Sequence, residues 1–151
     1  MISVAIVEDI DSIRIPIFEF LSDQEEFLCE TASNSVEHFF ENYNKEIAPD
    51  VILLDIGLPG LSGLSAIKLI KEKLPSTDII MLTVHEESDK IFSALKAGAS
   101  GYLIKSTSLL DIKSAIIEES KGGAPMSPII ARKVINYFED DKKSTSEVNL
   151  T

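Results

Sequence analysis

The sequence predicts an α/β fold of the doubly wound type, in which helices cover both faces of a parallel sheet. Short apolar runs of β type alternate along the chain with longer segments of helical periodicity. Several of the runs are almost wholly apolar, as expected for strands that are buried on both faces. The length of 151 residues fits one such domain with a short appendage.

Five of the apolar runs are predicted to be the strands of this sheet. Each run is short, and a longer segment with helical spacing follows it, which is typical of repeated βαβ units. The predicted strands lie near residues 3–8, 27–32, 51–55, 79–83 and 101–104.

Periodicity, caps and breakers place the first three helices between these strands. The first, near 11–22, carries apolar residues on one stripe, and the second, near 36–45, has Ser35 as its N-cap. The third follows Gly63 and stops before Pro75. The apolar stripe of the first helix consists of Ile13, Ile17, Phe20 and Leu21.

The next two helices are predicted to end at glycines. The fourth helix, near 88–97, ends at Gly98, and the fifth, near 107–121, ends at Gly122 and Gly123. Glycine is the usual residue just past the end of a helix because it adopts the required left-handed conformation without strain.

A sixth, appended helix is predicted within residues 123–138. Ser127 is placed as its N-cap and Pro128 as its first helical residue. The stretch 139–151 is polar and has nothing to bury, so we expect it to be a linker toward a further domain. The appended helix has three apolar residues at helical spacing, namely Ile130, Val134 and Phe138.

The charge of the chain argues against nucleic acid as a direct partner. There are 25 Asp and Glu residues against 14 Lys and Arg, a net charge of minus 11. Binding to DNA or RNA depends heavily on basic side chains that displace counterions from phosphates. We therefore expect no direct DNA contact by these residues.

The sequence also gives an expectation about location. No apolar run approaches the roughly 18 residues that a membrane span requires, and the start of the chain lacks the pattern of a secretion signal. We expect a cytoplasmic protein without a membrane partner. The single cysteine, Cys29, cannot form an internal disulfide and is expected to be a buried small hydrophobic residue.

Five polar residues stand where predicted strands end. Glu8 and Asp9 follow the first strand, and Asp55, Thr83 and Lys105 close the third, fourth and fifth. Ligands of open α/β sheets bind beyond the carboxyl ends of the strands, so these side chains form a candidate reaction site. Three carboxylates at close quarters repel one another, and a divalent cation relieves that repulsion. The composition of the cluster indicates a metal ion and a phosphoryl group.

These five residues, in this order, resemble the receiver domain of two-component response regulators over roughly residues 1–122. Two further stretches support the resemblance, 55–60 with 62–63, and 94–105. The resemblance implies a flavodoxin-like sheet of five parallel strands in the order 2-1-3-4-5, with five helices and the appended helix. It also implies a signalling switch that catalyses only its own phosphoryl transfer and autodephosphorylation.

The resemblance assigns a phosphoryl acceptor and a metal site. Asp55 would be the nucleophile that takes a phosphoryl group from a sensor histidine kinase or a small phosphodonor. The expected cofactor is Mg²⁺ or Mn²⁺, because carboxylates, waters and phosphate oxygens suit such ions. The implied protein ligands are Glu8, acting directly or through a water, Asp9, Asp55 and the backbone carbonyl of Gly57.

The resemblance also implies a switch. Lys105 and the hydroxyl of Thr83 would contact phosphoryl oxygens, and Tyr102 would be a switch aromatic that turns inward as Thr83 moves. The alternative is that Tyr102 is simply an edge aromatic that packs on the fourth helix. Phosphorylation would then bias two packings of the fourth helix, fifth strand and fifth helix. The expected result is homodimerisation or the release of a DNA-binding domain.

The end of the chain narrows the resemblance. Residues 122–128, the added helix and the closing pair 150–151 resemble regulators whose receiver is joined to a LuxR-type (NarL/FixJ-like) helix-turn-helix. This implies transcription regulation, with DNA contacted only through a domain that this chain lacks.

Four residues near the site have particular interpretations. Val84 stands where the family usually has Ala or Gly and is expected to affect access to the phosphoryl group. Ser106 replaces a common Pro, so a retained cis bond would be a costly non-proline one. His85 is a candidate to face the phosphate or to modulate its hydrolysis, whereas His38 is interpreted as structural.

Three other functions are alternatives to the phosphorylation switch. A Mg²⁺-dependent hydrolase like the haloacid dehalogenases would have a second Asp two residues after the nucleophile, where this chain has Gly57. A flavin-binding domain would need a phosphate loop after the first strand, where Glu8 and Asp9 would repel the phosphate. A protein interaction module that works without phosphorylation remains open, because Val84 is expected to alter access.

Overall fold

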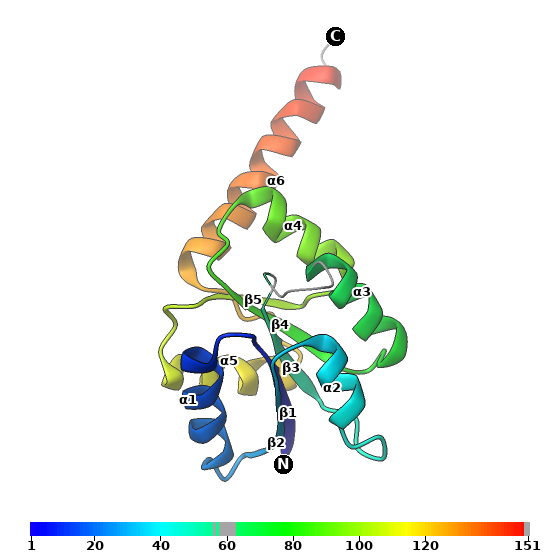
Figure 1. The fold of residues 1–151 in the computed structure, drawn as a ribbon. Coiled ribbons are helices and arrows are strands. Elements are labelled where there is room, and N and C mark those ends of the chain that lie inside the picture. Colours follow the sequence, from blue (N-terminus) through cyan, green and yellow to red (C-terminus); the bar gives the residue numbers. More distant parts are fainter. Residues whose placement is uncertain (56, 58–62, 150–151) are drawn as a thin grey trace.

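The computed structural model describes residues 1–55, 57 and 63–149, with side chains described through residue 140 (Figure 1). Five parallel strands form one sheet in the order β2-β1-β3-β4-β5, which confirms the predicted fold class. The strands are β1 (Ile2–Val7), β2 (Phe27–Ser33), β3 (Val51–Leu54), β4 (Asp78–Thr83) and β5 (Gly101–Ile104).

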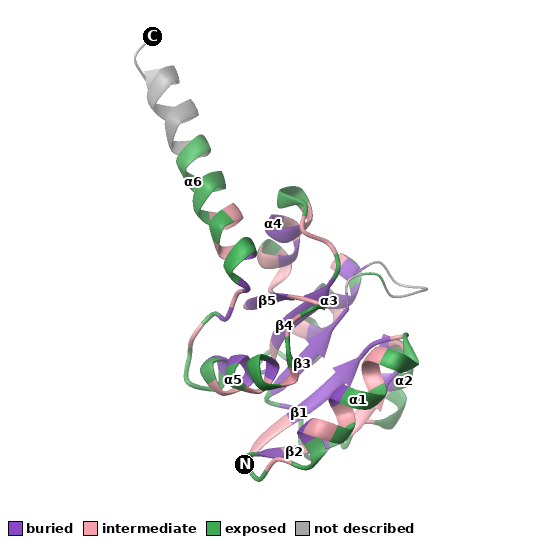
Figure 2. Ribbon diagram, turned by 90° about the vertical axis from the view of Figure 1, so that its left-hand side faces the viewer, coloured by how far each residue is buried: buried purple, intermediate pink, exposed green. Residues whose placement is uncertain are grey.

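Helices cover both faces of the sheet, as Figures 1 and 2 show. Helices α1 and α5 pack on one face, and α2, α3 and α4 pack on the other. The helices are α1 (Asp11–Ser22), α2 (Val36–Asn42), α3 (Gly63–Lys73), α4 (Ser88–Ala97), α5 (Leu109–Ser120) and α6 (Pro128–Asn149).

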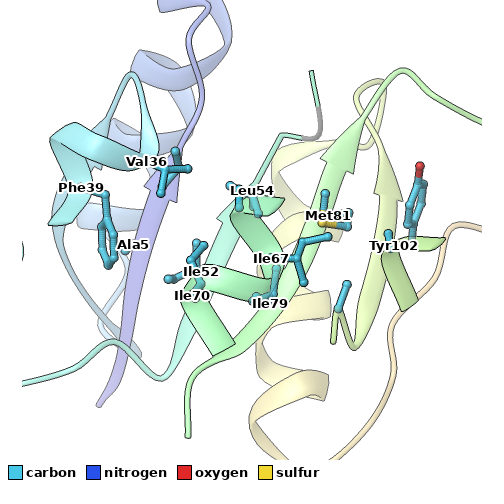
Figure 3. Packing of buried hydrophobic residues seen from close by; sticks show 14 of the residues in the cluster. Ala5, Val36, Phe39, Ile52, Leu54, Ile67, Ile70, Ile79, Met81 and Tyr102 are labelled. Atoms are coloured by element: carbon cyan, nitrogen blue, oxygen red, sulfur yellow. The ribbon is translucent and has the colours of Figure 1, made fainter. Parts of the chain in front are cut away.

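Alternate residues of β1, β3, β4 and β5 pack into two apolar clusters, one on each face, whereas β2 contributes to one of them. In β3, Ile52 and Leu54 lie in the cluster with α2, α3 and α4 (Figure 3), whereas Val51 and Leu53 lie in the cluster with α1 and α5. Side chains of a strand point alternately to the two faces, so a strand covered on both sides is apolar throughout. In β3 and β4 polar side chains are therefore confined to the ends of the strands, whereas the edge strand β2 carries Glu30 and Thr31 in its middle.

Caps explain several of the element boundaries. Ser35 Oγ accepts a hydrogen bond from a backbone N–H of α2 at 3.1 Å, as predicted, and Gly98 follows α4 with a φ of 126°. Two predicted boundaries were wrong. Helix α2 ends at Asn42 rather than near 45, and α5 begins at Leu109, because Ser108 caps it, rather than near 107.

Helix α6 begins at Pro128, as predicted, but continues to Asn149 instead of ending near 138. The stretch after residue 138 contains no glycine or proline that would stop a helix. The prediction that the polar stretch would end the helix was wrong. A stretch without apolar residues cannot be buried, but it can still have high helix propensity. The division into receiver, appended helix and linker stays a prediction, and residues 150–151 lie outside the described residues.

Residues 125–127 lie along the outer edge of β5. The N–H of Tyr102 donates to the carbonyl of Pro125 at 2.9 Å, and the N–H of Ser127 donates to the carbonyl of Tyr102 at 3.1 Å. Ser127 was predicted to cap the appended helix. Its Oγ instead accepts a hydrogen bond from the N–H of Ile104 in β5 at 3.1 Å. The edge strand is thereby paired before α6 begins.

The first turns of α6 then pack on α4. Ile130 is fully buried, and the ring of Tyr137 stacks on that of Phe92 with 3.7 Å between centroids. Lys133 Nζ donates to the carbonyl of Glu86 at 2.5 Å, in the segment between β4 and α4. Figure 1 shows the rest of α6 extending away from the sheet.

Two further predictions concern burial. Cys29 is a free thiol that is 7% exposed, as predicted, and burial raises its pKa to about 11. Within residues 1–55, 57 and 63–149, no helix is both long enough and apolar enough to cross a membrane.

Candidate functional site

The five polar residues predicted at strand ends lie at one edge of the sheet. Glu8 and Asp9 follow β1, and Asp55 follows β3, its neighbour in the sheet. Thr83 is the last residue of β4, and Lys105 follows β5. Because all five strands are parallel, their carboxyl ends meet there, at the position where open α/β sheets bind ligands.

Three carboxylates form the centre of the site. Glu8, Asp9 and Asp55 each place one oxygen within 4.8 Å of the others. Glu8 is 3% exposed and Asp55 is 5% exposed, whereas Asp9 is half-buried. Glu8 Oε2 has no hydrogen-bond partner among the described residues. Buried carboxylate oxygens at this spacing fit a hard divalent cation, which binds oxygen ligands.

Lys105 bridges two of these acids. Its Nζ lies 2.7 Å from Glu8 Oε1 and 3.1 Å from Asp55 Oδ2, and its side chain is 10% exposed. A buried charge is tolerated only when it is paired. Lys105 therefore partly compensates the negative charge that the acids bring together.

The pKa values reflect this balance of burial and pairing. Burial is the main reason that the pKa of Glu8 rises to about 7; the neighbouring Asp55 raises it further, and Lys105 opposes both. Burial by itself lowers the pKa of Lys105, but the hydrogen bonds to Glu8 and Asp55 outweigh it, and the net change is upward. Lys105 is thus a permanent cation at neutral pH.

The backbone near Asp55 supplies another donor. The N–H of Gly57 donates to Asp55 Oδ1 at 3.1 Å, so the two oxygens of this carboxylate have different partners. The sequence had assigned only the carbonyl of Gly57. Position 56 and the stretch 58–62, which include most of the residues 55–63 that support the resemblance, lie outside the described residues.

Thr83 and Tyr102 are connected through His85. Thr83 is fully buried, and its Oγ1 accepts a hydrogen bond from the N–H of His85 at 3.2 Å. The hydroxyl of Tyr102 donates to the carbonyl of His85 at 2.8 Å. Burial, with smaller contributions from nearby acids, raises the pKa of Tyr102 to about 12. Tyr102 is fully buried and belongs to the cluster in Figure 3, which also contains residues of α4.

The side chain of His85 has a partner that the sequence did not reveal. Lys90 Nζ lies 3.1 Å from His85 Nδ1, and Glu87 Oε2 lies 3.7 Å from the same nitrogen. The spacing of five residues between His85 and Lys90 is not a helical contact, and His85 precedes α4. Only the turn into α4 brings the two side chains together.

The remaining residues lie apart from the acids or at the surface. His38 is on α2 and exposed, and its interpretation as structural stays a prediction. Val84 is 65% exposed, and its effect on access stays a prediction. The described residues include no cis peptide bond, so the bond between Lys105 and Ser106 is trans.

Comparisons with known proteins all identify similarity to response regulators. The model of the response regulator receiver domain matches residues 4–117. The transcriptional regulatory protein LnrK of Bacillus subtilis (strain 168) is 35% identical over 144 residues, which cover 95% of this chain and 64% of LnrK. The response regulator protein VraR of Staphylococcus aureus (strain Mu3 / ATCC 700698) is 32% identical over 138 residues, 91% of this chain and 66% of VraR. The chain thus spans about two thirds of the length of these relatives.

Solved structures agree with this result. A two-component response regulator of the LuxR family from Aurantimonas sp. SI85-9A1 has a TM-score of 0.80 and 26% identity, over 89% of this chain and 96% of that chain. The isolated receiver domain of RcsB from Salmonella enterica serovar Typhimurium, with the phosphomimetic BeF₃⁻, has a TM-score of 0.78 at 22% identity, over 87% of this chain and 97% of that chain. The second likeness bears on the fold alone.

Proposed function

The chain belongs to the family of response regulator receiver domains and resembles those of LuxR-type regulators, and from this premise we propose that it is a switch operated by phosphorylation of Asp55. The phosphoryl group would come from a sensor histidine kinase. Its relatives are transcriptional regulators, so the output would be control of an attached DNA-binding domain, accompanied by homodimerisation.

The observation that carries this proposal is the environment of the Asp55 carboxylate. One oxygen is held by Lys105 and the other by the N–H of Gly57, with Glu8 and Asp9 beside them. A carboxylate at a strand end, oriented by two donors, is suited to attack phosphorus and form an acyl phosphate. The Lys105 ammonium stabilises the charge that develops on the phosphoryl oxygens.

The acids also support a cofactor. Glu8, Asp9, Asp55 and the carbonyl of Gly57 would hold Mg²⁺ or Mn²⁺, with Glu8 acting directly or through a water. The bound cation would neutralise phosphoryl oxygens and offset repulsion between them and the carboxylates. The unpartnered Glu8 Oε2 supports this assignment.

The switch would use the connection from Thr83 to Tyr102. If the Thr83 hydroxyl turns to a phosphoryl oxygen, its hydrogen bond from His85 is strained or lost. His85 also accepts from Tyr102, so the change reaches β5 and the start of α4. A shift from 1:99 to 99:1 between two packings needs roughly 5.5 kcal/mol of differential stabilisation.

The test is to treat the protein with acetyl phosphate and Mg²⁺ and to measure its intact mass. We expect one added phosphoryl group in the wild type and none in Asp55→Asn. Asp23→Asn changes an exposed acid just after α1 and should leave the mass gain intact. A phosphoryl adduct that persists in Asp55→Asn would refute the acceptor, and no adduct in any variant would favour an interaction module that works without phosphorylation.

A further inference from the structure

His85 faces the same space as the carboxylate of Asp55. A Cβ placed on Gly57 would lie 3.7 Å from His85 Nε2 and 3.9 Å from each carboxylate oxygen of Asp55. Because glycine has no side chain, nothing from residue 57 fills this space. The imidazole Nε2 and the carboxylate of the proposed phosphoryl acceptor therefore border the same position.

The other ring nitrogen fixes which tautomer faces that space. Lys90 Nζ is 3.1 Å from His85 Nδ1, and a lysine ammonium has only donors, so Nδ1 must be the acceptor. A neutral imidazole whose Nδ1 accepts carries its proton on Nε2. The carboxylate of Glu87 is 3.7 Å from Nδ1, too far for a hydrogen bond, and leaves this assignment unchanged.

The backbone of His85 is held as firmly as its ring. Its N–H donates to Thr83 Oγ1 at 3.2 Å, and its carbonyl accepts from the Tyr102 hydroxyl at 2.8 Å. Thr83 and Tyr102 are both fully buried. In the chain without a phosphoryl group the backbone of His85 is thus held at two points. The tautomer of its ring is set by Lys90 of α4, through a contact that does not involve the Thr83 hydroxyl.

We infer that Lys90 holds His85 in the tautomer with a proton on Nε2, which slows hydrolysis of the phosphoryl group on Asp55. This inference rests on the proposed function. His85 would donate to a phosphoryl oxygen through Nε2–H and contact the reacting group directly. Lys90 acts through His85 and is a positioning residue.

The chemistry explains why the tautomer matters. In hydrolysis, the oxygen of a water forms a bond to phosphorus while the bond from phosphorus to Asp55 breaks. The carboxylate is restored, inorganic phosphate leaves, and the water must lose a proton. An Nε2 lone pair would accept that proton as a general base. An Nε2 that already carries hydrogen can only donate, so water attacks without that assistance.

The experiment measures how fast the phosphorylated chain loses its phosphoryl group. The protein is loaded with acetyl phosphate and Mg²⁺, the donor is removed, and intact mass is followed over time. Lys90→Met frees Nδ1 and should speed the loss on the order of tenfold to a hundredfold, within the range of general base catalysis. Lys90→Arg keeps a donor at Nδ1 and should restore the slow rate. Lys96→Met removes an exposed lysine of the same helix and should have no effect.

A double variant separates the tautomer from the charge of Lys90. If the lysine acts through the imidazole, Lys90→Met in a His85→Leu background should lose the phosphoryl group no faster than His85→Leu alone. The direct contact is tested with beryllium trifluoride as the phosphoryl analogue. His85→Leu should weaken its binding by roughly tenfold, because a hydrogen bond to a charged group is lost. His85→Gln, which keeps an N–H donor, should bind more tightly than His85→Leu.

The outcomes distinguish this inference from the proposed function. If the wild type gains no phosphoryl group on Asp55, both are overturned. If it is phosphorylated but Lys90→Met keeps the wild-type rate, only the inference is overturned. The same conclusion follows if Lys90→Met speeds the loss equally in the His85→Leu background, or if His85→Leu binds beryllium trifluoride as the wild type does.

Discussion

At the scale of single residues, Lys105 is the group on which the other charges of the site depend. It lies between Glu8 and Asp55, both nearly buried, and it is itself 10% exposed. The interaction holds the acids together in the folded chain, although they are far apart in sequence. The residue proposed to stabilise a phosphoryl group therefore also stabilises the fold.

Lys105→Met should accordingly destabilise the protein. The methionine preserves most of the side-chain volume but leaves two buried carboxylates without their cation, which typically costs about 3 kcal/mol or more. Urea unfolding at pH 8 measures the change. Added Mg²⁺ should recover part of the loss, because a divalent cation offsets the same repulsion. An unfolding free energy equal to that of the wild type would contradict the ion-pair geometry.

Glu119 is a buried acid that lies away from the site. It is 3% exposed and accepts a hydrogen bond from Ser100 Oγ at 2.6 Å. Burial is the largest cause of its raised pKa, and the hydrogen bond from Ser100 opposes it. Because the folded pKa lies above the unfolded value, the folded state favours the protonated form. This contribution to stability is present at low pH and is lost as pH rises through the folded pKa.

Glu119→Gln should therefore stabilise the protein at neutral pH and not in acid. The amide remains neutral and still accepts from Ser100, so the variant avoids burying a charge at pH 8 and has no such advantage near pH 4. Urea unfolding at the two pH values measures the difference. The control Glu72→Gln alters an exposed acid of α3 and should change stability little at either pH. An equal gain for Glu119→Gln at both pH values would contradict the prediction.

At the scale of elements, α6 is attached to the body by its first turns. Residues 125–127 pair with β5, Ile130 is buried, and the ring of Tyr137 stacks on Phe92 of α4. Helix α4 also carries Lys90, which contacts His85. Helix α4 therefore both contacts the proposed switch and supports α6.

Tyr137→Ala should loosen α6 without disturbing the sheet. The aromatic pair contributes about 1 kcal/mol beyond its buried area, so amides of residues 128–138 should exchange hydrogen faster, while those of α1 keep their protection. Ile135→Ala is the matched control, because Ile135 is 46% exposed and its truncation removes little packing. Unchanged exchange in α6 of Tyr137→Ala would show that the stack does not hold the helix.

At the scale of the whole molecule, the net negative charge of this chain argues against direct DNA binding by these residues. LnrK is described as a transcriptional regulatory protein, and this chain, which spans 64% of LnrK, has a net charge of minus 11. Contacts to DNA are dominated by basic side chains at the phosphates. Any DNA binding would have to come from a part that these residues do not include.

The chain by itself should therefore not bind DNA. Fluorescence anisotropy of a labelled duplex at low salt should stay flat as protein is added, both before and after treatment with acetyl phosphate and Mg²⁺. Low salt is the stringent condition, because it favours electrostatic binding. A rise in anisotropy that disappears with added salt would contradict this prediction. It would indicate a local basic patch on the surface despite the negative net charge.

Much of the molecule could be predicted without coordinates. The alternation of apolar strands and amphipathic helices follows from the spacing of residues, and parallel pairing brings Glu8, Asp9, Asp55 and Lys105 to one edge. The prediction that α6 would end near 138 failed because burial and helix propensity were treated as one property. The contacts of His85 with Lys90 and Tyr102 could not be predicted, because they join residues that share no sequence period.

The sequence by itself determined the fold class and the edge of the sheet at which the polar residues gather, because side-chain periodicity and strand direction are local properties. The tertiary structure alone decided the pairing inside that edge: which oxygen of Asp55 faces Lys105, that Gly57 lies beside both His85 and Asp55, and that Tyr102 is buried. These depend on distances between residues far apart in the chain, which are set by how helices and strands pack and not by any one segment.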